Sequence, residues 1–227
     1  MKMVIKLVMT MLIVTVSINA KESSPAMIID EMIKEYGGEK NIKQLNSYEQ
    51  VWHIETMMSD KNGTDNRMVL MPDLLRTELI YPDKTEIRSL VRDYGTKQYG
   101  ERMIQAQGPM LDAMKLQLMR LYNPLVLKTK LKDTTILPDE KYYILSVNIN
   151  GLVAKYFVSK KSYLIEKVIG KLTMGNQSME FKTLYQNYKY VKGVMMPHKE
   201  IKYAGSANTA IMRLQTTTFM APPSRHR

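Results

Sequence analysis

The chain has 227 residues, enough for a sizeable core, and its 44% apolar and 24% charged residues are ordinary for a globular protein. It has no cysteine, which excludes disulfide bonds, thiol catalysis, cysteine-ligated metals and a cysteine-linked lipid anchor. The net charge is +11. The basic residues are spread along the chain without interleaved aromatics, so we expect no nucleic-acid partner, whereas an anionic membrane surface remains a candidate partner.

The first twenty residues have the pattern of a secretory signal peptide. Two lysines precede the apolar run Leu7–Val16, and Ala20 fits the last position before cleavage. Ile18 is not a small residue, so cleavage after Ser17 is an alternative. A retained N-terminal anchor is the other alternative, but the run is shorter than the ~20 apolar residues of a membrane-spanning helix. We expect export to the periplasm with cleavage near Ala20, which removes two lysines and lowers the net charge from +11 to +9.

Two helices are predicted at the start of the mature chain. Ser24 can cap the first helix, and Pro25 occupies its favoured first position. Apolar residues then recur at helical spacing until Gly37-Gly38 ends the pattern. A shorter helix is predicted from Glu39 to Leu45.

A first set of strands follows, because apolar and polar residues begin to alternate. The predicted strands are Tyr48 to Met58, Arg67 to Met71, Leu74 to Tyr81, Glu86 to Asp93 and Lys97 to Arg102. The pair Asn62-Gly63 predicts a tight hairpin turn between the first two strands.

A helical insert over residues 108–131 interrupts this rhythm, and Asn123-Pro124 ends or kinks it. Strands then resume, with a second hairpin signal at Asn150-Gly151. The predicted strands of this second set are Tyr142 to Ile149, Leu152 to Ser159, Tyr163 to Met174, Ser178 to Val191, Pro197 to Ala204 and Thr209 to Phe219.

These elements predict an α+β fold that is mainly antiparallel β. A sheet of about 10–11 strands is near the size at which an open sheet must curl, so we expect a curled, unclosed β-barrel. The amphipathic helices are available to act as lids over its concave face. We expect a single domain over residues 21–220 and a disordered tail over residues 221–227.

Four stretches carry a resemblance to a known family. They are MIIDEMIKEYGGEKNIKQLNSYEQVWHIE (27–55), MPDLLRTELIYPDK (71–84), VSKKSYLIEKV (158–168) and YQNYKYVKGVMMPHKEIKY (185–203). Through these phrases the chain resembles the outer-membrane lipoprotein carrier family, LolA/LolB-like, and specifically its outer membrane lipoprotein-sorting branch. The resemblance covers nearly the whole mature chain, and its motifs are structural, not catalytic.

The resemblance implies a periplasmic half-barrel whose helices cover a hydrophobic cavity for lipid or lipoprotein acyl chains. It also implies an arginine inside the barrel that acts as a latch, for which Arg67, Arg76 and Arg88 are the strand-borne candidates. The same scaffold serves stress-signal sensors, so the alternative function is a non-enzymatic sensor or interaction module that contacts an envelope protein.

No catalytic machinery is recognisable, so we expect no enzyme, no cofactor and no metal. His53 and His198 each stand alone in strands, without partners at ligand or general-base spacing. There is no Gly-x-Ser-x-Gly elbow and no phosphate-binding Gly-x-x-x-x-Gly-Lys loop. An enzyme that orients a hydrophobic intermediate in the cavity is a third hypothesis, but no convergent polar set supports it.

The ligand-binding candidates are apolar residues of the predicted inner wall and lids. They are Trp52, Ile54, Leu70, Leu79, Met114 and Leu118. The chain has 20 methionines, and methionine is common both at adaptable apolar binding surfaces and in ordinary cores. We expect a monomer that exchanges its ligand with envelope transport proteins.

Overall fold

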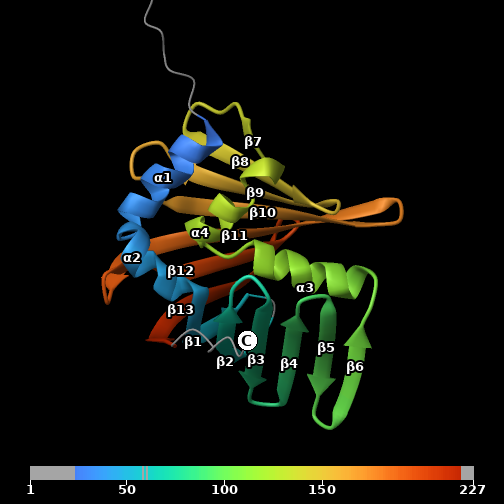
Figure 1. The fold of residues 1–227 in the computed structure, drawn as a ribbon. Coiled ribbons are helices and arrows are strands. Elements are labelled where there is room, and N and C mark those ends of the chain that lie inside the picture. The colour runs from blue at the N-terminus through green and yellow to red at the C-terminus, as the bar shows by residue number, and fades with distance from the viewer. Residues whose placement is uncertain (1–23, 58, 60, 221–227) are drawn as a thin grey trace, which may run out of the picture.

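The computed structural model describes residues 24–57, 59 and 61–220, so the predicted signal peptide and disordered tail lie outside the described residues. One sheet of 13 antiparallel strands makes up most of the fold, and helices lie across one of its faces (Figure 1). The predicted α+β class is therefore confirmed, with 13 strands where about 10–11 were expected. No helix within the described ranges is long and apolar enough to cross a bilayer.

The helices are α1 (Pro25–Glu35), α2 (Gly38–Ile42), α3 (Pro109–Met119) and α4 (Pro124–Thr129), with short 3-10 helices η1 (Lys43–Asn46) and η2 (Leu131–Asp133). The first strands are β1 (Ser47–Thr56), β2 (Asn62–Leu70), β3 (Leu74–Tyr81), β4 (Lys84–Val91), β5 (Tyr94–Tyr99) and β6 (Arg102–Ala106). The later strands are β7 (Thr134–Leu137), β8 (Tyr142–Ile149), β9 (Leu152–Ser159), β10 (Ile165–Met174), β11 (Gln177–Val191), β12 (Val194–Ala204) and β13 (Ala207–Phe219).

The sheet consists of two meanders joined in the middle. Its order is β6-β5-β4-β3-β2-β1-β13-β12-β11-β10-β9-β8-β7, so the first and last strands of the chain pair with each other. Within the described residues β6 and β7 are the two edges and do not pair, which leaves the barrel open as predicted. In Figure 1 the strands β2–β6 lie at a large angle to β8–β12, so the sheet is strongly curled. Its concave side is called the trough below.

The predicted hairpin turn at Asn62-Gly63 is wrong. Both residues belong to β2, where Gly63 pairs with Ile54, and the chain turns earlier, between Thr56 and Asn62. A Cβ atom on Gly63 would lie 2.6 Å from the ring of Tyr81. The glycine is therefore explained by a side chain that lies over it, not by a turn. Asn150-Gly151, in contrast, does form a hairpin turn, with φ of 52° and 85°.

The two additional strands come from short edge elements. The predicted strand Lys97 to Arg102 is wrong because it crosses the turn at Gly100, which separates β5 from β6. The strand β7 was not predicted, since its four residues are too few to show a periodic pattern. Such short edge strands are stabilised by their neighbours more than by their own sequence.

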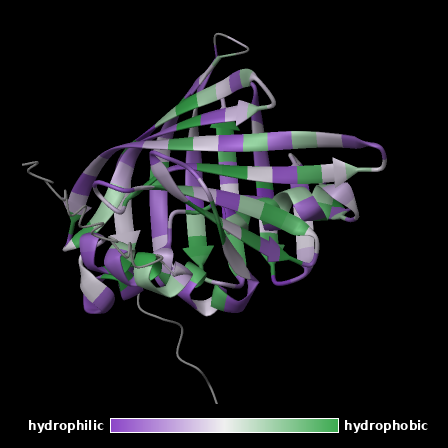
Figure 2. Cartoon of the chain, turned by 90° about the horizontal axis from the view of Figure 1, so that it is seen from above, coloured by the Kyte–Doolittle hydropathy of each residue, from purple (hydrophilic) through white to green (hydrophobic). Residues whose placement is uncertain are grey.

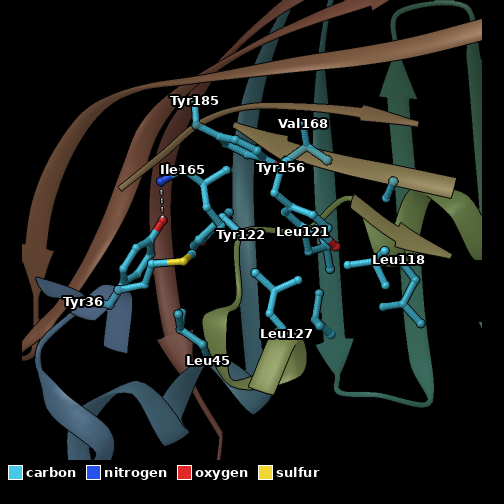
Figure 3. Packing of buried hydrophobic residues seen from close by; sticks show 14 of the residues in the cluster. Tyr36, Leu45, Leu118, Leu121, Tyr122, Leu127, Tyr156, Ile165, Val168 and Tyr185 are labelled. Carbon is cyan, nitrogen blue, oxygen red and sulfur yellow. Dashed lines mark hydrogen bonds between the residues drawn. The ribbon is translucent and has the colours of Figure 1, made fainter. Parts of the chain in front are cut away.

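Alternating side chains place the core inside the trough. Figure 2 shows hydrophilic and hydrophobic residues alternating along the strands. The main apolar cluster joins α1, α3 and α4 to the sheet, and Figure 3 shows Tyr36, Leu45, Tyr122, Leu127 and Tyr185 among its members. The hydroxyl of Tyr36 accepts a hydrogen bond from the backbone N–H of Ile165 at 3.2 Å (Figure 3). Much of the trough is thus filled by the protein's own side chains.

Candidate functional site

A cleft of about 370 Å³ remains open beneath α3, on the concave side of the sheet. Its lining comes from α3, from β4 and β5 on one side, and from β11, β12 and the start of β13 on the other. The lining residues are Arg88, Lys97, Met110, Ala113, Met114, Gln117, Arg120, Phe181, Lys202, Tyr203, Ala204 and Thr209. The cleft therefore lies between the two meanders, with α3 as its roof.

Two glycines that face the trough allow α3 to rest on both halves of the sheet. A Cβ on Gly95 of β5 would lie 3.0 Å from the sulfur of Met114, and a Cβ on Gly170 of β10 would lie 2.8 Å from Cγ of Leu116. A side chain at either position would therefore press against α3. The predicted role of the helical insert as a lid agrees with this placement.

Two tyrosines hold the C-terminal end of α3. The hydroxyl of Tyr185 donates to the carbonyl of Arg120 at 2.5 Å, and that of Tyr156 donates to the carbonyl of Met119. The last carbonyls of a helix have no partner within the helix, so these bonds satisfy them and fix that end to β9 and β11. At the other end, Met110 is 39% exposed.

One wall of the cleft carries two cations that share a carboxylate. Arg88 and Lys97 both form ion pairs with Glu86, and the Lys97 Nζ to Glu86 Oε1 distance is 3.1 Å. Burial by itself would raise the pKa of Glu86, but the charge of Arg88 and hydrogen bonds from both cations outweigh it and hold the pKa below its usual range. Glu86 is therefore a carboxylate at neutral pH.

The floor of the trough contains a buried charge cluster. Arg67 of β2 bonds Glu200 of β12 through both terminal nitrogens, at 3.0 and 3.2 Å, and also bonds Asp65 at 3.0 Å. Lys202 lies 3.4 Å from Glu200. The Arg67 guanidinium lies over the ring of Trp52, 5.2 Å from its centroid. This charge cluster lies between the main apolar cluster and a smaller one around Trp52, Ile54 and Met212. The inner wall is therefore not the uniformly apolar surface that we expected.

Arg120, at the end of α3, lines the cleft and has no carboxylate partner among the residues that the structure describes. Its Nη1 donates to the hydroxyl of Thr183 at 3.1 Å, and its guanidinium lies 5.6 Å from the centroid of Phe181. Its Nε is buried and makes no hydrogen bond. Burial lowers the pKa of Arg120 below its ordinary value, because the charged form has lost its water.

The six predicted ligand-binding residues do not form one group. Trp52, Ile54 and Leu79 pack together in the smaller apolar cluster. Met114 lines the cleft, whereas Leu118 belongs to the main cluster. Leu70, the sixth, alternates with the buried Val69 and so faces the outer side of the sheet.

Leu70 helps to line a second, larger pocket of about 780 Å³ at the ends of the strands. This pocket is lined by Lys43, Gln44, Asn46, Ser47, Leu70, Met71, Pro72, Asp73, Leu74, Val91, Arg92 and Met220. Val91, which is 46% exposed, alternates with the buried Leu90 and so faces the outer side of the sheet, as Leu70 does. We place the candidate site beneath α3 because that cleft lies on the trough side of the sheet and has a helix as its roof.

Of the three candidate arginines, two lie on the trough side. Arg67 is buried in the charge cluster and Arg88 lines the cleft, whereas Arg76 is on the outer side and pairs with Glu78. Sequence reasoning missed Glu200 and the other charged partners. The signal was present in β2. Asp65, Arg67 and Val69 stand at every second position, so the two charged side chains point to the same face of the sheet as the apolar Val69.

Comparisons with known proteins bear on the fold. No protein-family model and no curated protein matches this chain. Among solved structures, it is similar to a LolA superfamily protein from Nitrosomonas europaea, with a TM-score of 0.60 and 11% identity, covering 88% of this chain and 96% of that one.

Two further structures give the same result. One is an outer membrane lipoprotein-sorting protein domain from Vibrio parahaemolyticus, with a TM-score of 0.55 and 11% identity over 88% of this chain and 94% of that one. The other is a DUF1329 family protein from Desulfovibrio piger, with a TM-score of 0.52 and 8% identity over 89% and 96% of the two chains. At these identities the likeness concerns the fold.

Proposed function

From the premise that the chain has the LolA-like fold, as its sequence resemblance predicted, we propose that it is a non-enzymatic carrier or binding protein of the bacterial envelope. It takes the acyl chain of a lipid or lipoprotein into the cleft beneath α3. The chain is exported to the periplasm, acts as a monomer, and exchanges its ligand with envelope transport proteins or an anionic membrane surface. The basic net charge favours such a surface.

The observation that carries this proposal is the roofed cleft. Its volume of about 370 Å³ falls within the ~300–1,000 Å³ range of small-molecule pockets. Met110 and Met114 offer flexible thioethers from the roof, and Phe181 offers an aromatic face from β11. Each buried methylene contributes ~0.8 kcal/mol, so about ten would contribute roughly 8 kcal/mol before ordering costs.

Native mass spectrometry tests the proposal. The full chain is exported to a bacterial periplasm, purified without detergent and analysed both intact and after lipid extraction. We expect a bound acyl lipid that is released by extraction. A protein that emerges empty, and that also fails to bind a decyl-chain compound in calorimetry, contradicts the proposal.

A matched pair of methionine variants places the ligand. Met110 lines the cleft and is 39% exposed, whereas Met103 is 61% exposed on β6 and does not line it. Met110→Gln puts a polar amide against the acyl chain, and we expect it to weaken decyl-chain binding about fivefold, as ~1 kcal/mol of lost burial implies. Met103→Gln is the control and should leave binding unchanged.

The alternative, a sensor or interaction module, is favoured by one observation. Tyr94 and Met103, on the outer strands β5 and β6, are 55% and 61% exposed. Large apolar side chains exposed at a sheet edge can mark a contact with a protein partner. Site-specific photo-crosslinking from position 103 in the periplasm should capture an envelope protein if this alternative holds, and should capture none if the outer strands contact no partner.

A further inference from the structure

The side chains around the cleft carry more positive than negative charge. The cations of the lining and the floor are Arg67, Arg88, Lys97, Arg120 and Lys202, and the carboxylates that pair with them are Asp65, Glu86 and Glu200. Five cations against three carboxylates leave an excess of two positive charges. All three carboxylates already pair with the four cations other than Arg120.

The excess is concentrated where the ligand would lie. The lining of the cleft includes four cations and no carboxylate. Arg120 has no carboxylate oxygen within 4.0 Å among the described residues, and its buried Nε lacks a hydrogen-bond partner. Within the described part of the chain Lys202 pairs with one carboxylate, that of Glu200, which Arg67 already binds through both of its terminal nitrogens. A partly buried cation without an anion costs free energy that a bound anion would recover.

The cleft shares lining residues with a second, smaller space beside these cations. A small void of about 20 Å³ adjoins it and is lined by Arg67, Gln117, Arg120, Leu121, Thr183, Tyr185, Glu200 and Lys202. Gln117, Arg120 and Lys202 line both spaces. The apolar residues Met110, Ala113 and Met114 lie along the preceding turns of α3. An apolar roof thus leads toward a polar, cationic end.

We infer that the ligand of this cleft is an anionic amphiphile, an acyl chain that carries a phosphate or carboxylate group, and that Arg120 and Lys202 bind the anion. This inference rests on the proposed function, since it names the chemical class of the acyl ligand. The guanidinium of Arg120 presents several N–H donors in one plane, the geometry that fits phosphate and carboxylate oxygens. Thr183 and Gln117 add a hydroxyl and an amide beside it.

Calorimetry with three probes tests the inference. The probes are decyl phosphate, monodecanoylglycerol and inorganic phosphate, with both amphiphiles below their micellar concentrations. The first two differ in head-group charge, and the third has no chain. We expect decyl phosphate to bind at least tenfold more tightly than monodecanoylglycerol, with a preference that shrinks at high salt, and inorganic phosphate to bind more weakly than both.

Each other outcome has a distinct meaning. Equal affinity for the two amphiphiles overturns the anion inference and leaves the proposed function standing. Binding of neither amphiphile contradicts the proposed function itself. If inorganic phosphate binds as tightly as decyl phosphate, the site recognises a free anion, and the amphiphile inference is wrong.

Two arginine variants assign the anion to the cleft. Arg120→Gln removes the charge and keeps an amide, and we expect at least tenfold weaker binding of decyl phosphate with monodecanoylglycerol affinity changed less than twofold. Arg92→Gln is the matched control, because Arg92 is exposed and lies outside the cleft. If Arg120→Gln fails to fold, Lys202→Gln takes its place with the same expected loss. If the folded variant binds decyl phosphate as tightly as the wild type does, the inference is overturned.

Discussion

Arg67 and Glu200 form a bidentate ion pair although they lie 133 residues apart in the sequence, on strands that are not neighbours in the sheet. In the sheet, β1 and β13 lie between β2 and β12. Three strand spacings of ~4.8 Å would separate the two backbones by roughly 14 Å in a flat sheet. Two side chains meet across that distance because the sheet curls and turns both of them into the trough. The pair therefore ties the two meanders together from inside.

Glu200→Gln should strongly destabilise the protein. The substitution leaves Arg67 buried with Asp65 as its only carboxylate and removes the partner of Lys202. Removing one member of a buried ion pair costs about 3–5 kcal/mol. We expect a loss of about 3 kcal/mol in the free energy of unfolding, measured by urea denaturation at pH 7. Glu180→Gln, at an exposed position of β11, is the control and should change it by less than ~0.5 kcal/mol.

Acid should destabilise the protein through the same carboxylate. Burial would raise the pKa of Glu200, but the charges of Arg67 and Lys202 outweigh it and lower the pKa from 4.5 to about 2. The folded state thus favours the ionised carboxylate, so its stabilisation is complete above about pH 4.5 and is lost as the pH falls toward 2. The loss amounts to about 3 kcal/mol. The free energy of unfolding, measured by urea denaturation across this window, should fall less steeply with decreasing pH for Glu200→Gln than for the wild type. Parallel curves would contradict the assignment.

Gly170→Ala should disturb the roof of the cleft. Its new methyl group would lie 2.8 Å from Cγ of Leu116 and 2.7 Å from Cδ of Arg120, so α3 must shift. We expect a cost of about 1–3 kcal/mol, as in other overpacked cores. Gly95→Ala should cost less, because its nearest contacts lie at 3.0 Å, farther than those of Gly170, and two of the three are the ends of the Leu111 and Met114 side chains. Lys171→Ala, on the outer side of β10, is the control, and an equal effect of all three substitutions would refute the packing argument.

The tyrosines beneath α3 should control how firmly its C-terminal end is held. Tyr185→Phe removes the hydrogen bond to the carbonyl of Arg120 and leaves that part-buried acceptor without this partner. An unsatisfied buried group costs about 1–3 kcal/mol. We expect faster amide hydrogen exchange across residues 109–120, measured by mass spectrometry. Tyr190→Phe is a suitable control because Tyr190 is 61% exposed, and similar exchange in both variants would show that the bond does not anchor the helix.

Local patterns in the sequence predicted most of the fold. Alternation over five to ten residues identified the long strands, and the Ser24 cap with Pro25 marked the start of α1, where the Ser24 hydroxyl accepts a bond from the N–H of Met27. These signals work because helix caps and strand faces involve residues close in sequence. The order of elements then indicated a curled sheet with helical lids, which the structure confirms.

The sequence by itself thus determined most of the strands, the helices and their order, whereas only the tertiary structure decided what lies inside the trough. Gly63 resembled a turn residue until the ring of Tyr81 was placed over it. Arg67 could be listed as an inner arginine, but its pairing with Glu200 depends on the curvature of strands that pair far apart in the chain. Packing of this kind depends on the positions of all the neighbours at once, so no local pattern encodes whether an interior is filled, hollow or charged.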